Sequence, residues 1–508
     1  MLDTPPLRHR LGQTGPSRHR TGSPPARRRT RPPTAPLRAP GGVSPRHRPA
    51  VRSTRLGEPP MSSLRTPAAP GVPVLGSLVD LRRDALQAYL RACRDRGDVV
   101  RFVAGPPGLR VAFHAIFSAS GAAQVLSAGA PFHKGGHLYR EVRAVIGDGL
   151  LTSDGGDHVR QRRLVQPLFT RRRVDGYAEG IRDETTRTLD GWRGRDGEVV
   201  DIAGEMTDLT LRVVTRLLFG ADGSAAVPTI QRCFPVLNSW TYRRGTSPVR
   251  TPREWPTPAN RRAASARAEL YALCDRIIAD RASAGADGAD LLSRLIRTRD
   301  EDGDRLSPSE VRDQVLLFLL AGHETTATAL SFSLHLLATH PEEQRRTRDE
   351  VDRVLGGREP LPADLPDLDH TTRVVKEALR LYPSAPVIAR SAREDTEIDG
   401  HRIPAGTEVA LMPWVTHRHP AYWSEPERFD PDRFLPEREA TRPRYAWYPF
   451  GGGPRACIGQ HFSMLETVLV LSMLTHAYRF EAVDRTVPVG QGVTLTPLGP
   501  NRCRLVAR

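Results

Sequence analysis

One cysteine near the C-terminal end of the sequence stands in a glycine-rich loop. The stretch FGGGPRACIGQHF, residues 450–462, fits the pattern F-x-x-G-x-R-x-C-x-G through Phe450, Gly453, Arg455, Cys457 and Gly459. We expect a helix to begin directly after this pattern. The unsatisfied N–H groups and the positive dipole end at the start of that helix favour a thiolate over a thiol at Cys457.

The neighbouring residue types suit a flat ligand that carries a metal and has acidic groups at its edge. Glycines have no Cβ, so the backbone can lie close to such a ligand. Arg455 offers a bidentate donor to a carboxylate. We interpret the loop as the holder of an iron-bound thiolate beneath a haem. Most lone cysteines are inert and buried, but the spacing of the fixed positions around Cys457 disfavours that interpretation.

A second group of polar residues interrupts an apolar helix. The capping box at Ser307–Glu310 predicts a helix from 308 to 339 that is buried on nearly all sides. Within it, AGHETT (321–326) contains Glu324 and Thr325, and a carboxylate in an apolar interior is costly unless it is paired. Two interpretations stay open. Gly322 permits close packing while the threonines bond back to carbonyls one turn earlier, or the helix opens into a groove where Glu324 and Thr325 pass protons.

Two further motifs lie between these segments. KEALRLYP places Glu377 and Arg380 three residues apart on one helical face. An exposed ion pair of little energetic weight is the default interpretation of such a pair. PERFDPDRF, residues 426–434, then supplies Arg428 among prolines and aromatic residues, where a guanidinium can be buried against carboxylates.

The elements that must position these motifs are mostly helices. The sequence predicts a helix over 80–97, followed by a strand at DVVRFV, and short strands elsewhere in a helix-rich body that begins at about residue 75. Residues 238–262 are rich in Pro, Gly and Arg and predict a long loop between two helices.

The motif order AGHETT, EALR, PERF and FGGGPRACIG resembles that of the cytochromes P450, the haem-thiolate monooxygenases. The resemblance covers about residues 65–508 and implies a mainly α fold with small β-sheets, in a single large haem-binding domain. It implies that Cys457 is the axial thiolate of haem b and that Glu377, Arg380 and Arg428 are structural. The other haem-binding residues that it implies, most of them propionate ligands, are His158, Arg162, Arg390, Phe450 and Arg455.

The resemblance also implies a mechanism. Thr325 would hold bound dioxygen and an ordered water, and Glu324 would relay protons from solvent, while the thiolate favours O–O cleavage. A C–H bond near the iron would then be hydroxylated, or a double bond epoxidised. Two alternatives remain: a haem-thiolate enzyme of another class, such as a peroxide-driven hydroxylase or an isomerase, and a haem-binding sensor or carrier. The intact Glu324–Thr325 pair argues against direct use of peroxide.

Partners and substrate follow from the same resemblance. Electrons would come from a ferredoxin or flavodoxin with its NAD(P)H reductase, since no flavin or nicotinamide motif follows Gly459. Arg160, Arg163 and the 171–173 run form a candidate docking face, although a solvated charge run is nearly as good an interpretation. The expected pocket walls, 132–149, 238–262, 317–321 and 384–388, are mainly apolar and suggest a terpenoid or fatty-acid-like substrate of secondary metabolism. We expect a monomer.

Charge is concentrated at the N-terminal end. Of the net charge of +16, residues 1–60 carry +11, from 13 arginines and two acids, with 13 prolines and no aromatic residue. Such a segment is expected to be disordered. A nucleic-acid or anionic-membrane arm and an organellar transit peptide are alternatives, but we expect that this stretch does not belong to the working protein, which would begin at Met61. We expect no nucleic-acid partner.

Cysteine usage and hydropathy limit the classes of protein to which this chain can belong. Five cysteines without a C-x-x-C pair support neither a zinc ribbon, nor covalently attached haem, nor a disulfide framework. That usage, with His158 where many relatives have Trp, suggests a bacterial, soluble and cytoplasmic protein. The longest useful apolar run, VLLFLLA, is far shorter than a membrane span, so no membrane anchor is expected.

Overall fold

Helices dominate the computed structural model, which describes residues 64–508 apart from 221–224, 284–287, 289 and 302. The prediction that residues 1–60 form a separate disordered segment lies outside the described residues. The α-helices are α1 (Leu78–Arg96), α2 (Ala119–Leu126), α3 (Gly136–Ile146), α4 (Gly155–Val165), α5 (Arg171–Asp175), α6 (Ala178–Trp192), α7 (Ile202–Phe219), α8 (Val227–Thr246), α9 (Pro258–Ser283), α10 (Leu291–Arg297), α11 (Pro308–Thr339), α12 (Pro341–Leu355), α13 (Asp369–Leu381), α14 (Pro413–Thr416), α15 (Pro436–Glu439) and α16 (Gln460–Ala477).

The strands form small sheets, as expected. They are β1 (Val99–Ala104), β2 (Val111–Ile116), β3 (Phe132–His133), β4 (Val199–Asp201), β5 (Ile388–Ala392), β6 (Thr396–Ile398), β7 (His401–Ile403), β8 (Glu408–Leu411), β9 (Tyr478–Ala482), β10 (Val489–Gln491), β11 (Leu495–Pro497) and β12 (Arg502–Ala507). One sheet has five strands in the order β1-β2-β8-β5-β3, in which β2 and β8 are parallel. The predicted helix over 80–97 and the strand after it are confirmed as α1 and β1.

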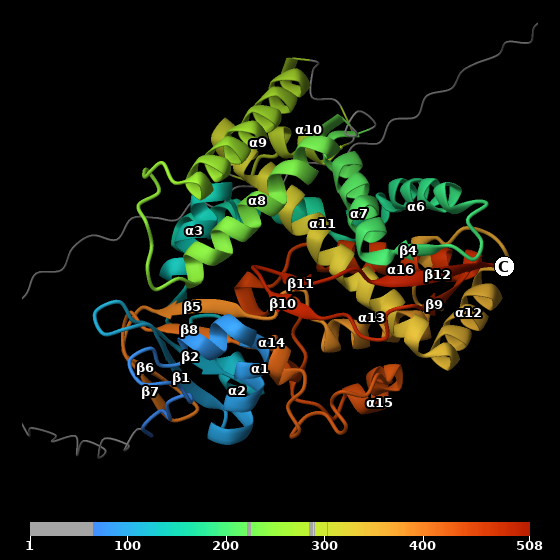
Figure 1. The fold of residues 1–508 in the computed structure, drawn as a ribbon. Coiled ribbons are helices and arrows are strands. Elements are labelled where there is room, and N and C mark those ends of the chain that lie inside the picture. The colour runs from blue at the N-terminus through green and yellow to red at the C-terminus, as the bar shows by residue number, and fades with distance from the viewer. Residues whose placement is uncertain (1–63, 221–224, 284–287, 289, 302) are drawn as a thin grey trace, which may run out of the picture. The chain divides into compact units, whose positions relative to one another are not determined.

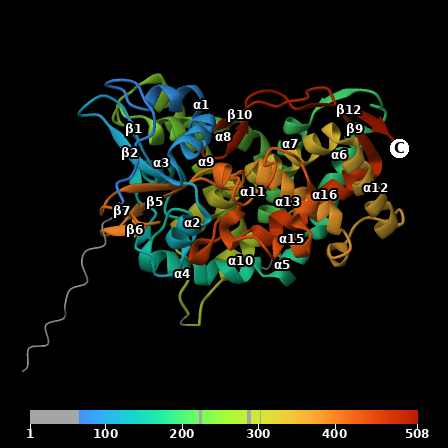
Figure 2. The same ribbon diagram turned by 90° about the horizontal axis from the view of Figure 1, so that it is seen from below.

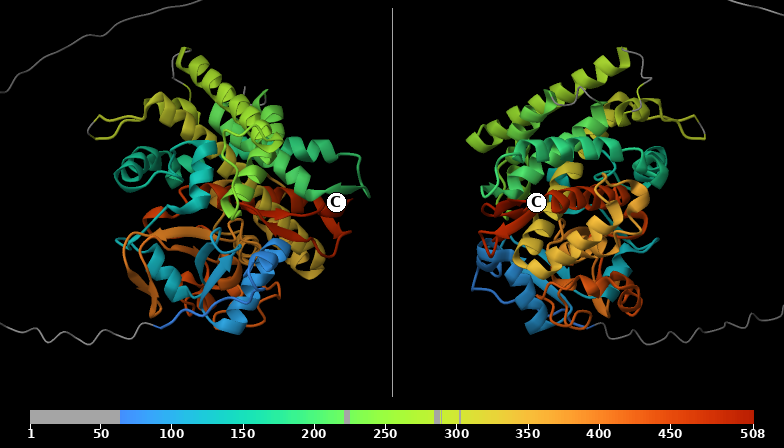
Figure 3. Two further views of the ribbon diagram at one scale, coloured as in Figure 1. Left: turned by 60° about the vertical axis from the view of Figure 1, so that its left-hand side comes forward. Right: turned by 90° about the vertical axis from the view of Figure 1, so that its right-hand side faces the viewer.

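The long helix α11 has the predicted boundaries and start. Ser307 Oγ accepts a hydrogen bond from the Glu310 backbone N–H over 3.3 Å, and Glu310 Oε2 accepts one from the Ser307 backbone N–H over 2.8 Å. This reciprocal pair satisfies two N–H groups that a helix start leaves unpaired. Figures 1 and 3 show α8 and α9 on one side of α11 and the five-stranded sheet on the other.

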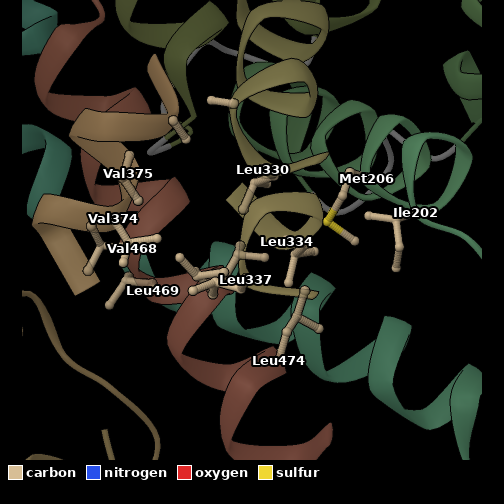
Figure 4. Packing of buried hydrophobic residues seen from close by; sticks show 14 of the residues in the cluster. Ile202, Met206, Leu330, Leu334, Leu337, Val374, Val375, Val468, Leu469 and Leu474 are labelled. Atoms are coloured by element: carbon tan, nitrogen blue, oxygen red, sulfur yellow. The ribbon is translucent and has the colours of Figure 1, made fainter. Parts of the chain in front are cut away.

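The main hydrophobic core joins α11 to three other helices. Leu330 and Leu334 of α11 meet Met206 of α7, Val374 of α13 and Leu469 of α16 in one buried cluster, shown in Figure 4. Figure 2 shows α13 and α16 beside α11 from another direction. Since α16 directly follows the Cys457 loop, this core fixes the loop relative to the AGHETT segment.

The predicted loop over 238–262 is confirmed only at 247–257 and is wrong at both ends. The chain stays helical to the end of α8 at Thr246 and becomes helical again at Pro258. Tertiary contacts hold the last turns of α8: a Cβ at Gly245 would lie 2.6 Å from Cδ1 of Leu138, and Arg244 Nε donates to Glu141 over 2.8 Å. Close packing against α3 therefore overrides the weak helix propensity of this stretch.

Candidate active site

The loop that carries Cys457 is fixed by its own backbone and by the end of α2. The backbone N–H of Cys457 donates to the carbonyl of Phe450 over 2.9 Å. Gly453 has a φ of +62°, and a Cβ there would lie 1.8 Å from the carbonyl oxygen of Leu126. Only glycine tolerates that approach. Part of the glycine pattern therefore serves packing, in addition to any role beside a ligand.

The surroundings of Cys457 set the proton affinity of its thiol. Water can reach the residue, yet burial by the surrounding protein raises the pKa of the thiol. The Gly459 backbone N–H and the cations of Arg162 and Lys134 act in the opposite direction without outweighing burial. The expected preference for thiolate is therefore wrong for the thiol taken alone. Coordination to a metal ion deprotonates a thiol outright.

Cationic side chains gather beside this loop. Arg455 donates from Nη1 to the Ser153 carbonyl over 2.7 Å and from Nη2 to Asp154 Oδ1 over 2.5 Å. Arg162 donates from Nη1 to the carbonyl of Ala456, the residue next to the cysteine, over 3.0 Å. Two arginines from distant parts of the sequence thus hold the segment before Cys457.

Arg390, Lys134 and His158 complete the cluster. Arg390 is buried, and its Nη1 donates to the hydroxyl of Tyr139 over 3.4 Å. Burial, with Arg390 and Arg455, brings the pKa of Lys134 well below its ordinary value. Burial, with Arg455 and Lys134, lowers the pKa of His158 to about 4.

This excess of positive charge fits a ligand with acidic groups. Asp154 is the acid that acts to raise the pKa of both Lys134 and His158, against the other causes. One carboxylate does not neutralise the surrounding arginines. The two propionates of a haem would supply the missing negative charge. The structure thus brings together the predicted residues His158, Arg162, Arg390 and Arg455, next to Cys457.

Lys134 was missed at the sequence level. It is one of only two lysines in a chain rich in arginine, and it lies in an expected pocket wall. Its Nζ donates to the Leu151 carbonyl over 2.8 Å and lies over the ring of Tyr139. The rarity of lysine in this sequence was the available signal.

Glu324 faces α8 from the middle of α11. Its Oε1 accepts a hydrogen bond from Asn238 Nδ2 over 2.9 Å. Burial raises the pKa of the Glu324 carboxyl, while hydrogen bonds from Thr494 and Asn238 lower it. Asn238 was placed in the predicted loop and was not recognised as a partner of this acid.

The AGHETT segment has features of both the packing interpretation and the proton-transfer interpretation. It stays helical throughout, so the expected local opening is wrong. Gly322 allows close packing, because a Cβ there would lie 2.9 Å from Val214 Cγ2 on α7. Thr325 Oγ1 donates to the Ala321 carbonyl over 2.6 Å, as the packing interpretation predicts, whereas Thr326 contacts α16. Yet Ala321 is exposed in the middle of a mostly buried helix, so solvent or a ligand can reach this turn.

The Glu377–Arg380 pair is structural. Its third partner is Arg433, whereas Arg428 was expected. Both side chains are fully buried, and Arg380 donates to Glu377 over 2.6 and 2.8 Å. The guanidinium of Arg433 lies 3.3 Å from Glu377. Arg428 points elsewhere: its side chain is 64% exposed and pairs with Glu425. The assignment of Arg428 is therefore wrong, and the default of an exposed pair is wrong as well.

The candidate docking face is partly neutralised by intramolecular ion pairs. Arg160 pairs with Asp304 and with Glu310, and Arg163 pairs with Asp300. The arginines at 171–173 are exposed. This second group, at the start of α5, therefore offers more free charge than the first.

Another set of ligand-type atoms lies outside this site. Cys93, Asp98 and His419 have atoms within 4.8 Å of one another. His419 Nε2 contacts Asp98 over 3.0 Å, and its Nδ1 accepts the Ala421 backbone N–H over 3.2 Å. Both ring nitrogens are engaged, so this group is a hydrogen-bonded cluster and not a metal centre.

One helix of the described part, α11, is long and apolar enough to cross a membrane by length and composition. Most of its side chains are buried inside the protein. Its apolar character is that of a core helix.

Comparisons with known proteins match most of the chain. The sequence profile of the family Cytochrome P450 matches residues 67–499. Cyclooctatin synthase of Streptomyces melanosporofaciens is 40% identical over 424 residues, which are 83% of this chain and 91% of that protein. Cyclooctat-9-en-7-ol 5-monooxygenase of the same organism is 37% identical over 445 residues, with 87% and 95% covered.

A further relative and a solved structure agree with these matches. Pentalenene oxygenase of Streptomyces avermitilis is 35% identical over 439 residues, 86% of this chain and 96% of that protein. The crystal structure of the cytochrome P450DA heme domain superposes with a TM-score of 0.79 at 30% identity and covers 88% of this chain and 98% of its own. The mainly helical fold expected from the four motifs is thereby confirmed.

Proposed function

Because the chain belongs to the cytochrome P450 family, we propose that Cys457 would bind the iron of haem b through its thiolate and that the substrate is a cyclic terpenoid. The chain is a monooxygenase that binds haem through a cysteine thiolate, takes electrons from redox partners and acts with O2 on a hydrophobic compound. We further propose that it is bacterial, cytoplasmic and monomeric.

The haem site is proposed from the cationic cluster beside Cys457, and this cluster is the observation that carries the proposal. Arg455, Arg390 and Arg162, with His158, would bind the propionates, and Phe450 would hold the loop through its carbonyl contact with the Cys457 N–H. When bound, a haem with a thiolate ligand supplies cleavage of the O–O bond, so that RH, O2, two electrons and two protons give ROH and water.

Proton delivery is assigned to Glu324 and Thr325. Burial raises the pKa of the Glu324 carboxyl, so this acid holds a proton more readily than an exposed glutamate does. Thr325 bonds to the Ala321 carbonyl, and its hydroxyl oxygen keeps acceptor capacity for an ordered water. Glu324 would take protons from solvent, and Thr325 would orient the water that passes them on.

The terpenoid proposal rests on relatives and on pocket composition. The names of three relatives refer to cyclooctatin, cyclooctat-9-en-7-ol and pentalenene. Ala321 is exposed on α11, and the residues before it on that helix are apolar. We propose C–H hydroxylation or epoxidation of such a ring system.

The redox partner is proposed to be a ferredoxin or flavodoxin with its NAD(P)H reductase. A surface hollow of about 410 Å³ lies against the Cys457 loop, lined by Phe450, Ala456, Gln460 and their neighbours, including Arg444. With the exposed 171–173 run, Arg444 would attract an acidic partner. Turnover with a ferredoxin should fall as ionic strength rises, and turnover independent of salt would count against docking at this surface.

The central test is the absorption spectrum of the reduced protein with carbon monoxide. Wild type should show the shifted Soret band of thiolate ligation, and Cys457→Ala should lose that band. A folded, haem-loaded wild type without it would contradict the assignment of Cys457. Product formation with reductant and O2, compared with peroxide alone, distinguishes a monooxygenase from the peroxide-driven alternative.

A further inference from the structure

A hollow of about 820 Å³ lies on the five-stranded sheet and shares no lining residue with the cluster beside Cys457. Its walls are β1, β2, His137 of α3, the segment at 64–66 and the segment from Arg402 to Glu408. A volume of this size accommodates a small molecule or a lipid headgroup.

The walls of this hollow carry far more positive than negative charge. Four lining residues are arginines, namely Arg65, Arg101, Arg110 and Arg402, and two are histidines, His114 and His137. Glu408 is the one acid among the lining residues of this hollow, and it accepts the His137 backbone N–H over 2.9 Å.

Three of the four arginines lack a compensating acid. Arg402 pairs with Asp395 over 2.8 Å. Within the described ranges, Arg65, Arg101 and Arg110 form no side-chain ion pair or hydrogen bond, and all three are exposed. Exposed arginines gathered around one concavity repel each other unless an anion enters it.

His114 adds an unsatisfied polar group to the same wall. It stands opposite Arg101 in the β1–β2 register, is only 7% exposed, and its Nδ1 has no hydrogen-bond partner among the described residues. Burial, followed by the charge of Arg101, lowers the pKa of His114 to about 4. The neutral ring can donate a hydrogen bond without adding to the repulsion.

We propose that this hollow binds the phosphate group of a small molecule or a phospholipid, held by Arg101 and Arg110. A phosphate carries more charge than a carboxylate, and its oxygens match the two-pronged guanidinium donor. The site is independent of the haem site and of the oxidation proposed there.

Titration calorimetry of the haem-loaded full chain with inorganic pyrophosphate, at constant ionic strength, tests the proposal. Wild type should bind one equivalent, and the double variant Arg101→Gln, Arg110→Gln should bind at least tenfold more weakly. Arg353→Gln removes another exposed arginine, from α12, and should bind as wild type does. Because all three positions are exposed, the variants should fold normally.

Co-sedimentation with vesicles identifies the source of the phosphate. Phosphatidylcholine vesicles containing phosphatidylglycerol should capture wild type but not the double variant if the ligand is a lipid, and vesicles of phosphatidylcholine alone should capture neither. Pyrophosphate binding without vesicle binding indicates a soluble ligand. Absence of both, or equal binding by wild type and the double variant, would overturn the proposal.

Discussion

The side-chain amide of Asn238 on α8 donates to the carboxyl of Glu324 on α11 over 2.9 Å. This bond joins the proposed proton-relay acid to the helix that covers it. The position of α8 and the proton affinity of Glu324 are therefore linked.

Asn238→Leu should shift the pH dependence of product yield. The hydrogen bond from Asn238 lowers the pKa of Glu324, so its loss should raise that pKa and keep the carboxyl protonated to higher pH. Product per NAD(P)H should drop several-fold near neutrality and recover partly as pH increases. Ser239→Ala, at the exposed neighbouring position, is the control. Identical pH profiles for both variants would contradict the link.

Thr325→Ala should retain haem and consume NAD(P)H while releasing peroxide in place of product. Within the described part of the chain, its hydroxyl donates only to the Ala321 carbonyl of its own helix, so its removal should leave the fold intact. Thr325→Ser keeps the hydroxyl and should restore most of the product yield. The measurement is peroxide per NAD(P)H consumed. Full product yield in the alanine variant would refute the role of this hydroxyl.

Arg455→Leu should weaken haem binding, whereas Arg393→Leu should not. Both arginines pair with Asp154 over 2.5 Å, but Arg455 is mostly buried beside Cys457 and Arg393 is half exposed. Loss of a charge-assisted bond to a propionate should speed haem transfer to apomyoglobin at least tenfold. Equal transfer rates in the two variants would show that Asp154, and not a propionate, is the relevant partner.

Arg433→Ala should destabilise the protein by about 3 kcal/mol, because it leaves a buried carboxylate less well compensated. The Arg433 guanidinium lies 3.3 Å from Glu377 and is 8% exposed. Arg428→Ala should change stability by less than about 0.5 kcal/mol, as its side chain is exposed. Denaturant unfolding of the haem-loaded proteins measures both. A larger loss of stability in Arg428→Ala than in Arg433→Ala would support Arg428 as the third structural residue.

Acidification should destabilise the protein partly through His417. Its Nε2 accepts the Tyr448 backbone N–H over 2.9 Å, which requires a neutral ring, and burial with Arg380 lowers the pKa of His417 to about 3. Between that value and the unfolded pKa of about 6.5, the unfolded state binds more protons, so stability falls as pH falls. From about pH 7 to about pH 5, wild type should lose roughly 2 kcal/mol more than His417→Gln. Equal losses in denaturant unfolding would exclude this contribution.

Local sequence signals were sufficient to predict the start of α11 and the glycine-rich turn before Cys457. The capping box at Ser307 acts within four residues, and Gly453 has a positive φ that favours glycine. The family resemblance also predicted that His158, Arg162, Arg390 and Arg455 share one site, because a resemblance carries long-range information that local patterns lack.

Residues distinguished only by tertiary contacts could not be assigned from sequence. Arg428 and Arg433 stand five apart in PERFDPDRF, and only the approach of Arg433 to Glu377 separates them. The end of α8 is helical because α3 packs against Gly245, and Asn238 gained its role from that helix. For Cys457, local features lower the pKa, but burial by distant segments prevails.

The Cys457 loop is held by segments that come much earlier in the chain. Gly453 packs against Leu126, and Arg455 binds Ser153 and Asp154. The two sides of this pocket are separated by about three hundred residues of chain. During translation the first side leaves the ribosome long before the second exists, so a nascent polypeptide cannot enclose its prosthetic group until synthesis is almost complete. Cofactor capture is thus a late event, and prematurely terminated products lack the means to retain iron.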